Sequence, residues 1–178
     1  MFKPEVDVAS VEQLSQTLPD DPNLIEDMVL TKIPYKYDWE MHGVPWYFPT
    51  VKQVLANGEG DCKARAIVLA SVLESKNIPY SINVSPIHVW VDYEGKEENS
   101  IENNAVNFYR EDPETGKKTF SLPRISVKEV LSSTYDGLWV PMPLLQKILL
   151  IAGLLLLMTA RILIWRLKIN KKQVIQVN

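Results

Sequence analysis

The residues best suited to covalent chemistry in this sequence are its one cysteine, Cys62, and its two histidines, His42 and His88. A thiol attacks as its thiolate, and the ordinary cysteine pKa of about 8.5 leaves little thiolate at neutral pH, so its surroundings must favour the anion. A single cysteine forms no internal disulfide, and with two histidines it has no zinc-ligand spacing. No metal or organic cofactor is therefore expected, and Cys62 is either a buried apolar residue or a reactive thiol.

The surroundings of Cys62 favour the reactive alternative. Asp61 and Cys62 are expected to open a helix over 62–76, whose first-turn N–H groups and dipole favour a negative charge. The same N–H groups can hold the oxyanion formed when a thiolate attacks a carbonyl. Gly58 and Gly60, just ahead, permit a close approach of backbone to a substrate. These residues define a candidate oxyanion and substrate region beside the thiol.

A general base is also available. His88 lies in the predicted strand 87–93, which follows the helix, and its imidazole can take the thiol proton and return one to a leaving group. His42 precedes a Gly-Val-Pro turn and is expected to be a solvated loop residue. One cysteine and one histidine are common in any chain, so this pattern alone leaves open a buried Cys62 and a structural His88.

The elements that must position this pair follow from periodicity and from capping residues. Apolar residues at three- and four-residue steps predict helices, and runs rich in β-branched and aromatic residues predict strands. Because helices come first and strands afterwards, the fold class is α+β, with the Cys62 helix packed across an antiparallel sheet that contains His88. The expected helices are 21–30, 50–58, 62–76 and 126–133, and the expected strands are 80–84, 87–93, 105–110 and 118–122.

One segment near the C-terminus is apolar enough to cross a membrane. The stretch 144–165 is interrupted only by Gln146, Lys147 and Arg161. About 20 helical residues cross a hydrocarbon layer of about 30 Å, whereas a soluble helix would need a polar face. We therefore expect a domain over 1–140, a transmembrane helix over 141–166 that contacts lipid through 144–165, and a basic tail over 167–178.

Positive charge predicts the orientation of this single-pass protein. Five lysines and arginines fall between 161 and 172, against only Lys147 at the other end of the apolar stretch, which favours a cytoplasmic tail and an extracytoplasmic domain. Residues 1–10 lack the apolar region of a signal peptide. Two alternatives remain: a targeting segment upstream of this sequence, which the charge bias favours, or a tail-anchored protein in the reverse orientation.

The segment from Gly58 to Tyr80, with its Gly-Glu-Gly-Asp-Cys-Lys core and its Asn-Ile-Pro ending, resembles the central motif of the transglutaminase-like superfamily. In that family a glycine-rich approach leads to a cysteine that opens a helix of small and aliphatic residues. The family's next signature is a His-Ala-Trp-Val-like strand, which His88-Val89-Trp90-Val91 resembles. The resemblance covers roughly residues 24–108 and implies a papain-like core with Cys62 as nucleophile and His88 as base.

The resemblance also implies a third catalytic residue, usually an aspartate on the strand after the histidine strand. No aspartate stands at that distance here, and Glu102, Asn103 and Asn104 occupy the region. Glu102 is preferred and Asn103 comes next, because a carboxylate or an amide can orient an imidazole; solvated turn residues are the alternative. Trp46 and Trp90 are expected to wall the substrate cleft or to lie in the core.

The function expected from these features is a membrane-anchored thiol enzyme that attacks amide bonds of a peptide or protein through a thioester, leading to hydrolysis or to acyl transfer onto an amine. The alternative is a non-catalytic transglutaminase-like subunit that binds peptide in a membrane complex with other subunits. Lys63 and Arg65 can favour the thiolate or simply face water. The net charge of −3 provides no broad basic face, so nucleic-acid binding is not expected.

Overall fold

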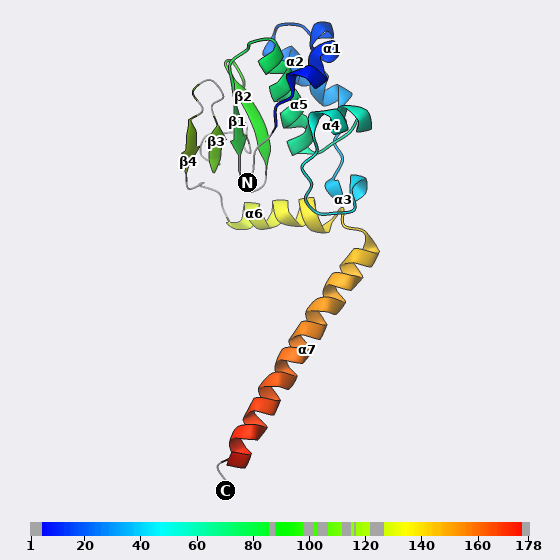
Figure 1. Ribbon diagram of the computed structural model, residues 1–178, viewed down its shortest axis with the longest axis vertical. Helices are drawn as coiled ribbons and strands as arrows, with labels where there is room; N and C mark the ends of the chain where they lie inside the picture. The colour runs from blue at the N-terminus through cyan, green and yellow to red at the C-terminus, as the bar shows by residue number, and fades with distance from the viewer. Residues whose placement is uncertain are drawn as a thin grey trace. The chain divides into compact units, whose positions relative to one another are not determined.

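The structure is a computed structural model that describes residues 5–85, 88–97, 102, 107–111, 115, 117–121 and 127–175. The chain divides into two compact units, Met1–Pro141 and Met142–Asn178. The first unit combines helices with an antiparallel sheet, and the second contains one long helix (Figure 1). The predicted α+β class is confirmed at this level.

The elements of the first unit follow the order of helices first and strands second. Its helices are α1 (Val8–Thr17), α2 (Pro22–Lys32), α3 (Asp38–Met41), α4 (Val51–Asn57), α5 (Cys62–Ser75), α6 (Val127–Thr134) and the π-helix η1 (Tyr135–Trp139). Its strands are β1 (Tyr80–Val84), β2 (Val89–Tyr93), β3 (Tyr109–Glu111) and β4 (Lys118–Phe120).

The capping residues explain why α2 and α4 lie where the sequence predicts them. The Asp21 side chain accepts hydrogen bonds from the first N–H groups of α2, and Pro22 opens the helix, where no N–H is needed. Thr50 and Gln53 form a reciprocal capping box at the start of α4. Gly58 ends α4 with a φ of 70°, a left-handed conformation that glycine adopts without strain.

Helix α5 is the centre of the unit. It contacts α1, α2 and α4 as well as strands β1 and β2 (Figure 1). Ten of its residues between 63 and 73 are buried, and Val68, Val72 and Leu73 are among the most completely enclosed side chains. A helix that is apolar on all sides is stable only inside a domain, so burial holds the Cys62 end of α5 in place.

The four described strands form an antiparallel sheet in the order β2-β1-β3-β4. Tyr80 pairs with Tyr93 and Val84 with Val89, so β1 and β2 form a hairpin with β2 at the edge. The predicted strand 87–93 in fact starts at Val89, which places His88 just ahead of β2, and Ile87 lies outside the described residues. The predicted strand 105–110 is shorter and shifted to 109–111, with 105–106 outside the described residues.

Helix α1 was not predicted, although Asp7 offers an N-cap and Val8, Val11 and Leu14 recur at three-residue steps. Val11 is fully buried, and the Asp7 side chain caps the helix by accepting from the Ser10 N–H at 3.1 Å. The Asp7 N–H in turn donates to the Ser71 hydroxyl on α5 at 3.0 Å. Helix α6 matches the predicted helix 126–133 apart from Ser126, which lies outside the described residues.

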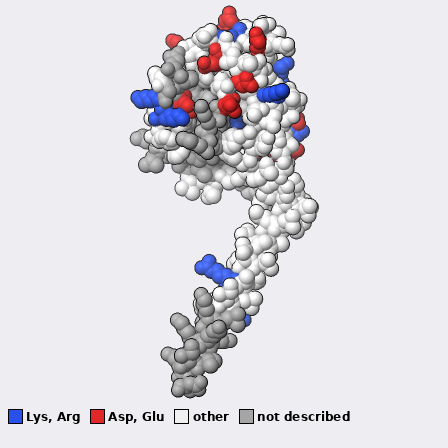
Figure 2. Space-filling view, viewed as in Figure 1, with Lys and Arg blue, Asp and Glu red and all other residues white. Residues whose placement is uncertain are grey.

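The second unit contains helix α7 (Leu144–Ile175). Its part Leu144–Arg166 is long and apolar enough to cross a membrane, and none of that window is buried by protein. The sequence of α7 has no acidic residue, and the face of the helix seen in Figure 2 has no red side chain. The backbone stays helical to Ile175, into the segment predicted as a basic tail.

Candidate active site

Cys62 is the first residue of α5, and Asp61 is its N-cap. Asp61 Oδ1 accepts hydrogen bonds from the backbone N–H groups of Lys63 at 3.1 Å and Ala64 at 3.2 Å. An aspartate at this position satisfies helix N–H groups that would otherwise be orphaned and stabilises the start of the helix. The half-buried Cys62 thiol is therefore held at the positive end of a capped helix.

The Cys62 N–H itself has no hydrogen-bond partner among the residues that the structure describes. Since Asp61 occupies the next two N–H groups of the helix, the Cys62 N–H is the first-turn donor left for a substrate oxygen. The Gly60 N–H, which the sequence placed in the oxyanion region, instead donates to the Pro34 carbonyl at 3.1 Å. Gly60 therefore has another use at this site.

That use is steric. A Cβ atom on Gly60 would lie 2.4 Å from the Ala64 Cβ, a distance at which one of them must shift. Gly60 also forms a parallel bridge with Tyr35. The absence of a side chain thus lets the Tyr35 segment and the approach to Cys62 pack closely against α5.

His88 is held by its backbone and by its ring. Its N–H donates to the Ser85 hydroxyl at 2.9 Å, and its carbonyl accepts from the Ser85 N–H at 2.8 Å. Its Nε2 lies 2.6 Å from Glu102 Oε1, which leaves Nδ1 for the Cys62 sulfur. The Trp90 ring is parallel to the imidazole within 8°, with the centroids 6.1 Å apart.

The charges around His88 favour an imidazolium. Burial alone would lower the pKa of His88, but hydrogen bonds with Cys62 and Glu102 and the attraction of both groups raise the pKa to about 9. Burial alone would raise the pKa of Glu102, but hydrogen bonding to His88 and attraction to Lys96 hold that pKa at about 2. Both groups are therefore ionised at neutral pH.

Two cavities meet at the Cys62–His88 pair. The first is lined by aromatic side chains that include Tyr35 and Trp46, and the second by apolar residues of α2 and α5 together with Trp90. Their volumes of about 110 and 140 Å³ are each several times the space that one water needs, about 10–15 Å³. A peptide could thus place a group on each side of the thiol.

The predicted cleft residues differ in exposure. Trp46 is 53% exposed and lines the first cavity, as a cleft wall would, whereas Trp90 is only 5% exposed and belongs mostly to the core. Lys63 does not face water: its ammonium pairs with Asp38 at 3.0 Å and with Asp61, and lies 4.7 Å from the Trp46 ring centroid. Burial alone would lower the pKa of Lys63, but attraction to Asp61 and hydrogen bonds to both carboxylates raise it, so the lysine stays charged.

The remaining predicted residues are placed as follows. Glu102 lies against His88, whereas Asn103 and Asn104 lie outside the described residues. His42 ends α3, with its ring centroid 4.1 Å from that of Tyr47. Arg65 donates from Nε to the Ile33 carbonyl at 2.8 Å.

Sequence reasoning missed Lys96, whose ammonium contacts Glu102 at 3.1 Å. The sequence predicts a turn at Glu94-Gly95-Lys96 but carries no local signal that the lysine reaches Glu102. It also missed Trp39, whose indole N–H is buried without a hydrogen-bond partner among the described residues and which lines the first cavity. Within the described parts of the chain, no cluster of three or more His, Cys, Asp or Glu side chains is placed to hold a metal ion.

The sequence matches no protein-family model and no curated protein.

Proposed function

We propose that this protein is a membrane-anchored thiol enzyme of the transglutaminase-like type, which attacks amide bonds of a peptide or protein through a Cys62 thioester. The observation that carries the proposal is the contact of His88 Nε2 with Glu102 Oε1 at 2.6 Å, in a ring that lines the same two cavities as Cys62. Three separate segments contribute these residues, which supports the roles of nucleophile for Cys62, base for His88 and orienting carboxylate for Glu102.

The reaction begins with the ion pair. The Cys62 thiolate attacks the amide carbonyl carbon, and the Cys62 N–H donates to the resulting oxyanion. The His88 imidazolium gives its proton to the amide nitrogen as the C–N bond breaks, which leaves a thioester and a neutral imidazole. Water or an amine then attacks the thioester carbonyl carbon and gives a proton to His88. The C–S bond breaks, which releases the acid or the new amide and restores the Cys62 thiolate. Glu102 keeps Nδ1 directed at the sulfur throughout.

We further propose that α7 is the single membrane anchor. The apolar window Leu144–Arg166 supports a span, and the cluster of lysines and arginines between 161 and 172 supports a cytoplasmic C-terminus and an extracytoplasmic domain. The substrate would then be a peptide or protein on the outer side of the membrane.

Thiol reactivity tests the proposal directly, because Cys62 is the only cysteine and any label reports on it alone. With the full chain in detergent micelles at pH 7, iodoacetamide should label Cys62 at least about tenfold faster than a free model thiol. The reason is that a thiolate paired with an imidazolium is the nucleophilic form of cysteine. His88→Ala should reduce the rate to that of the free thiol. His42→Ala is the matched control and should leave the rate unchanged.

A rate no faster than that of the model thiol would overturn the enzyme proposal and favour the non-catalytic peptide-binding subunit. If Cys62 is reactive, a fluorescent primary amine offered with a glutamine-containing protein distinguishes the two outcomes of the thioester. Covalent incorporation of the amine indicates acyl transfer, whereas release of ammonia without incorporation indicates hydrolysis.

A further inference from the structure

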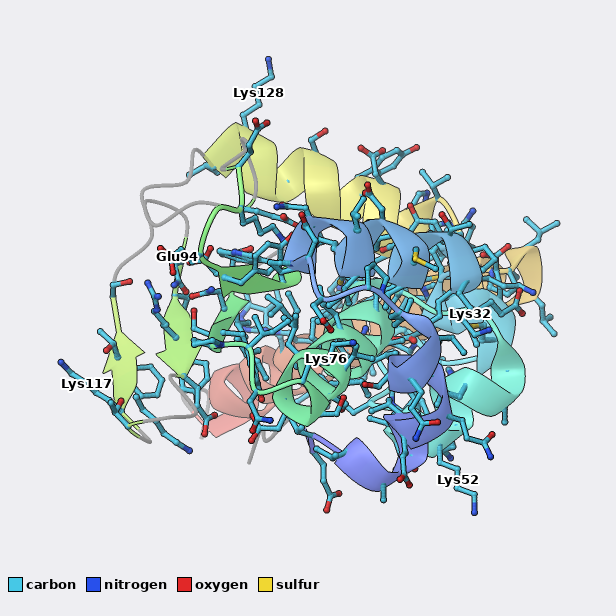
Figure 3. All side chains as sticks on the ribbon, turned by 90° about the horizontal axis from the view of Figure 1, so that it is seen from above. Lys32, Lys52, Lys76, Glu94, Lys117 and Lys128 are labelled. Atoms are coloured by element: carbon cyan, nitrogen blue, oxygen red, sulfur yellow. The ribbon has the colours of Figure 1, made fainter. Side chains whose placement is uncertain are left out.

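A buried lysine on the far side of Glu102 completes a chain of charges that starts at the thiol. Lys96 Nζ lies 3.1 Å from Glu102 Oε2 and 2.8 Å from Glu26 Oε1, and it donates to the Val91 carbonyl at 2.8 Å. Its side chain is 9% exposed, in contrast to Lys52, Lys117 and Lys128, which extend outward from the ribbon in Figure 3. Lys96 is therefore held by three acceptors.

We propose that Lys96 is a positioning residue, which fixes the Glu102 carboxylate so that its other oxygen orients the His88 ring toward Cys62. The inference rests on the proposed function, since it assigns how the same site is held together. Its physical basis is that Glu102 uses one oxygen for each partner, Oε1 for His88 and Oε2 for Lys96.

The contacts of His88 with Oε1 and of Lys96 with Oε2 together fix the plane of the Glu102 carboxylate. Loss of the Lys96 contact on Oε2 gives the Glu102 carboxylate more freedom to turn about its terminal torsion, because that torsion has broad minima. With Lys96 on Oε2 the carboxylate is fixed at both oxygens, and charge-assisted hydrogen bonds of this kind are short and strong. The imidazole is then fixed in turn, as a base in a catalytic site must be.

Lys96 is itself anchored to both neighbouring elements. The turn after β2 brings it back, with Gly95 at a φ of 86° and the Lys96 N–H donating to the Tyr93 carbonyl at 3.2 Å. From α2, Glu26 accepts from Lys96 through one oxygen and from the Tyr93 hydroxyl through the other. The position of Glu102 therefore depends on α2 and β2.

The test measures the titration of His88, which requires no enzymatic activity. The chain has only two histidines, so a ¹³C-histidine NMR titration of the full chain in micelles shows two signals, assigned with His42→Gln. The groups that act on the His88 ring are the Cys62 sulfur and Glu102; Arg65 and Glu26 line the second cavity beside it, and Asp38, Asp61 and Lys63 line the first. The wild-type signal should titrate near pH 9.

The two possible roles of Lys96 predict opposite signs. Lys96→Met removes a positive charge, and by charge alone this would raise the His88 pKa. If Lys96 positions Glu102, the loss of the ordered carboxylate outweighs that effect, and the His88 pKa falls by about one pH unit or more. A rise or no change would overturn the proposal. In a Glu102→Gln background Lys96→Met should no longer lower the pKa, and a fall there would also overturn it.

Lys76→Met is the matched control, because the Lys76 side chain is also largely enclosed, at 13% exposed, and ion-paired, but with Asp20 and not with Glu102. It should not lower the His88 pKa, and an equal fall would show general loosening instead of positioning. If Lys96→Met does not fold, Lys96→Leu, which also removes the ammonium and leaves no donor for Glu102, is titrated with the same sign expected. An unreactive Cys62 with a lowered His88 pKa would contradict the enzyme proposal but not this one.

Discussion

Two lysines with little-exposed side chains, Lys63 at 5% and Lys96 at 9%, lie near the candidate site, and each bridges two carboxylates. Lys63 joins Asp38 to Asp61, and Lys96 joins Glu26 to Glu102. Each ammonium also lies over an aromatic ring, at 4.7 Å from Trp46 for Lys63 and 5.5 Å from Tyr93 for Lys96.

The carboxylates paired with the two lysines differ in their other hydrogen-bond partners. The two carboxylates paired with Lys63 accept hydrogen bonds from backbone N–H groups: Asp61 caps α5, and Asp38 accepts from the Tyr47 N–H at 2.8 Å. On the side of Lys96, Glu102 binds an imidazole. The same ionic arrangement therefore stabilises backbone conformation around Lys63 and contacts a titrating imidazole around Lys96. Changes at Lys63 should mainly alter stability, and changes at Lys96 should mainly alter the behaviour of His88.

The largest expected effect is on the Lys63 side. Lys63→Met leaves two buried carboxylates with no cation between them and should destabilise the first unit by about 3–5 kcal/mol. Urea unfolding of the full chain in micelles, followed by tryptophan fluorescence, measures it. Lys52→Met on the exposed face of α4 should stay within about 0.5 kcal/mol. A loss at Lys63 no larger than at Lys52 would contradict its structural role.

Gly60→Ala should have the next largest effect, about 1–3 kcal/mol, because the new Cβ would overlap that of Ala64. The same unfolding experiment measures it. Adding Ala64→Gly removes the overlap and should restore part of the loss, less about 1 kcal/mol for glycine inside a helix. If the double variant is less stable than either single variant, the overlap is not the cause.

The pairing of His88 with Glu102 predicts a dependence of stability on pH. The His88 pKa rises from 6.5 to about 9 on folding, so its contribution is complete below pH 6.5 and is lost as the pH rises through about 9. The Glu102 pKa falls from 4.5 to about 2, so its contribution is complete above pH 4.5 and is lost as the pH falls through about 2. Glu102→Gln should therefore cost most between these limits, about 1–2 kcal/mol at pH 5.5. An equal cost at pH 5.5 and pH 10 would contradict the pairing.

The smallest expected effect concerns the aromatic ring beside Lys63. Trp46→Leu removes the cation–π contact but leaves both carboxylates, so the loss of stability should be below about 1 kcal/mol. Because Trp46 also lines the first cavity, peptide turnover or labelling by a peptide-based thiol reagent should fall more than labelling by iodoacetamide does. Equal decreases with both reagents would show that Trp46 affects the thiol and not the substrate.

Local signals predicted much of the fold. The caps at Asp21, Thr50 and Asp61 and the stop at Gly58 act on their own helices, so they could be read directly from the chain. Helix α1 was missed although its Asp7 cap is a local signal of the same kind, and only folding brings the Asp7 N–H to Ser71, more than 60 residues away. The limits of β2 depend on pairing with β1, which is why the strand begins one residue after His88.

At the candidate site, the sequence by itself determined which groups are available: one thiol at a predicted helix start, one histidine in a predicted strand and a carboxylate fourteen residues later. Only the tertiary structure decided that the thiol shares two cavities with the imidazole, that Gly60 serves packing, and that Lys96 reaches Glu102. The reason is physical. Capping and periodicity act within a few residues, whereas the charge on a buried group depends on partners that folding brings from distant segments.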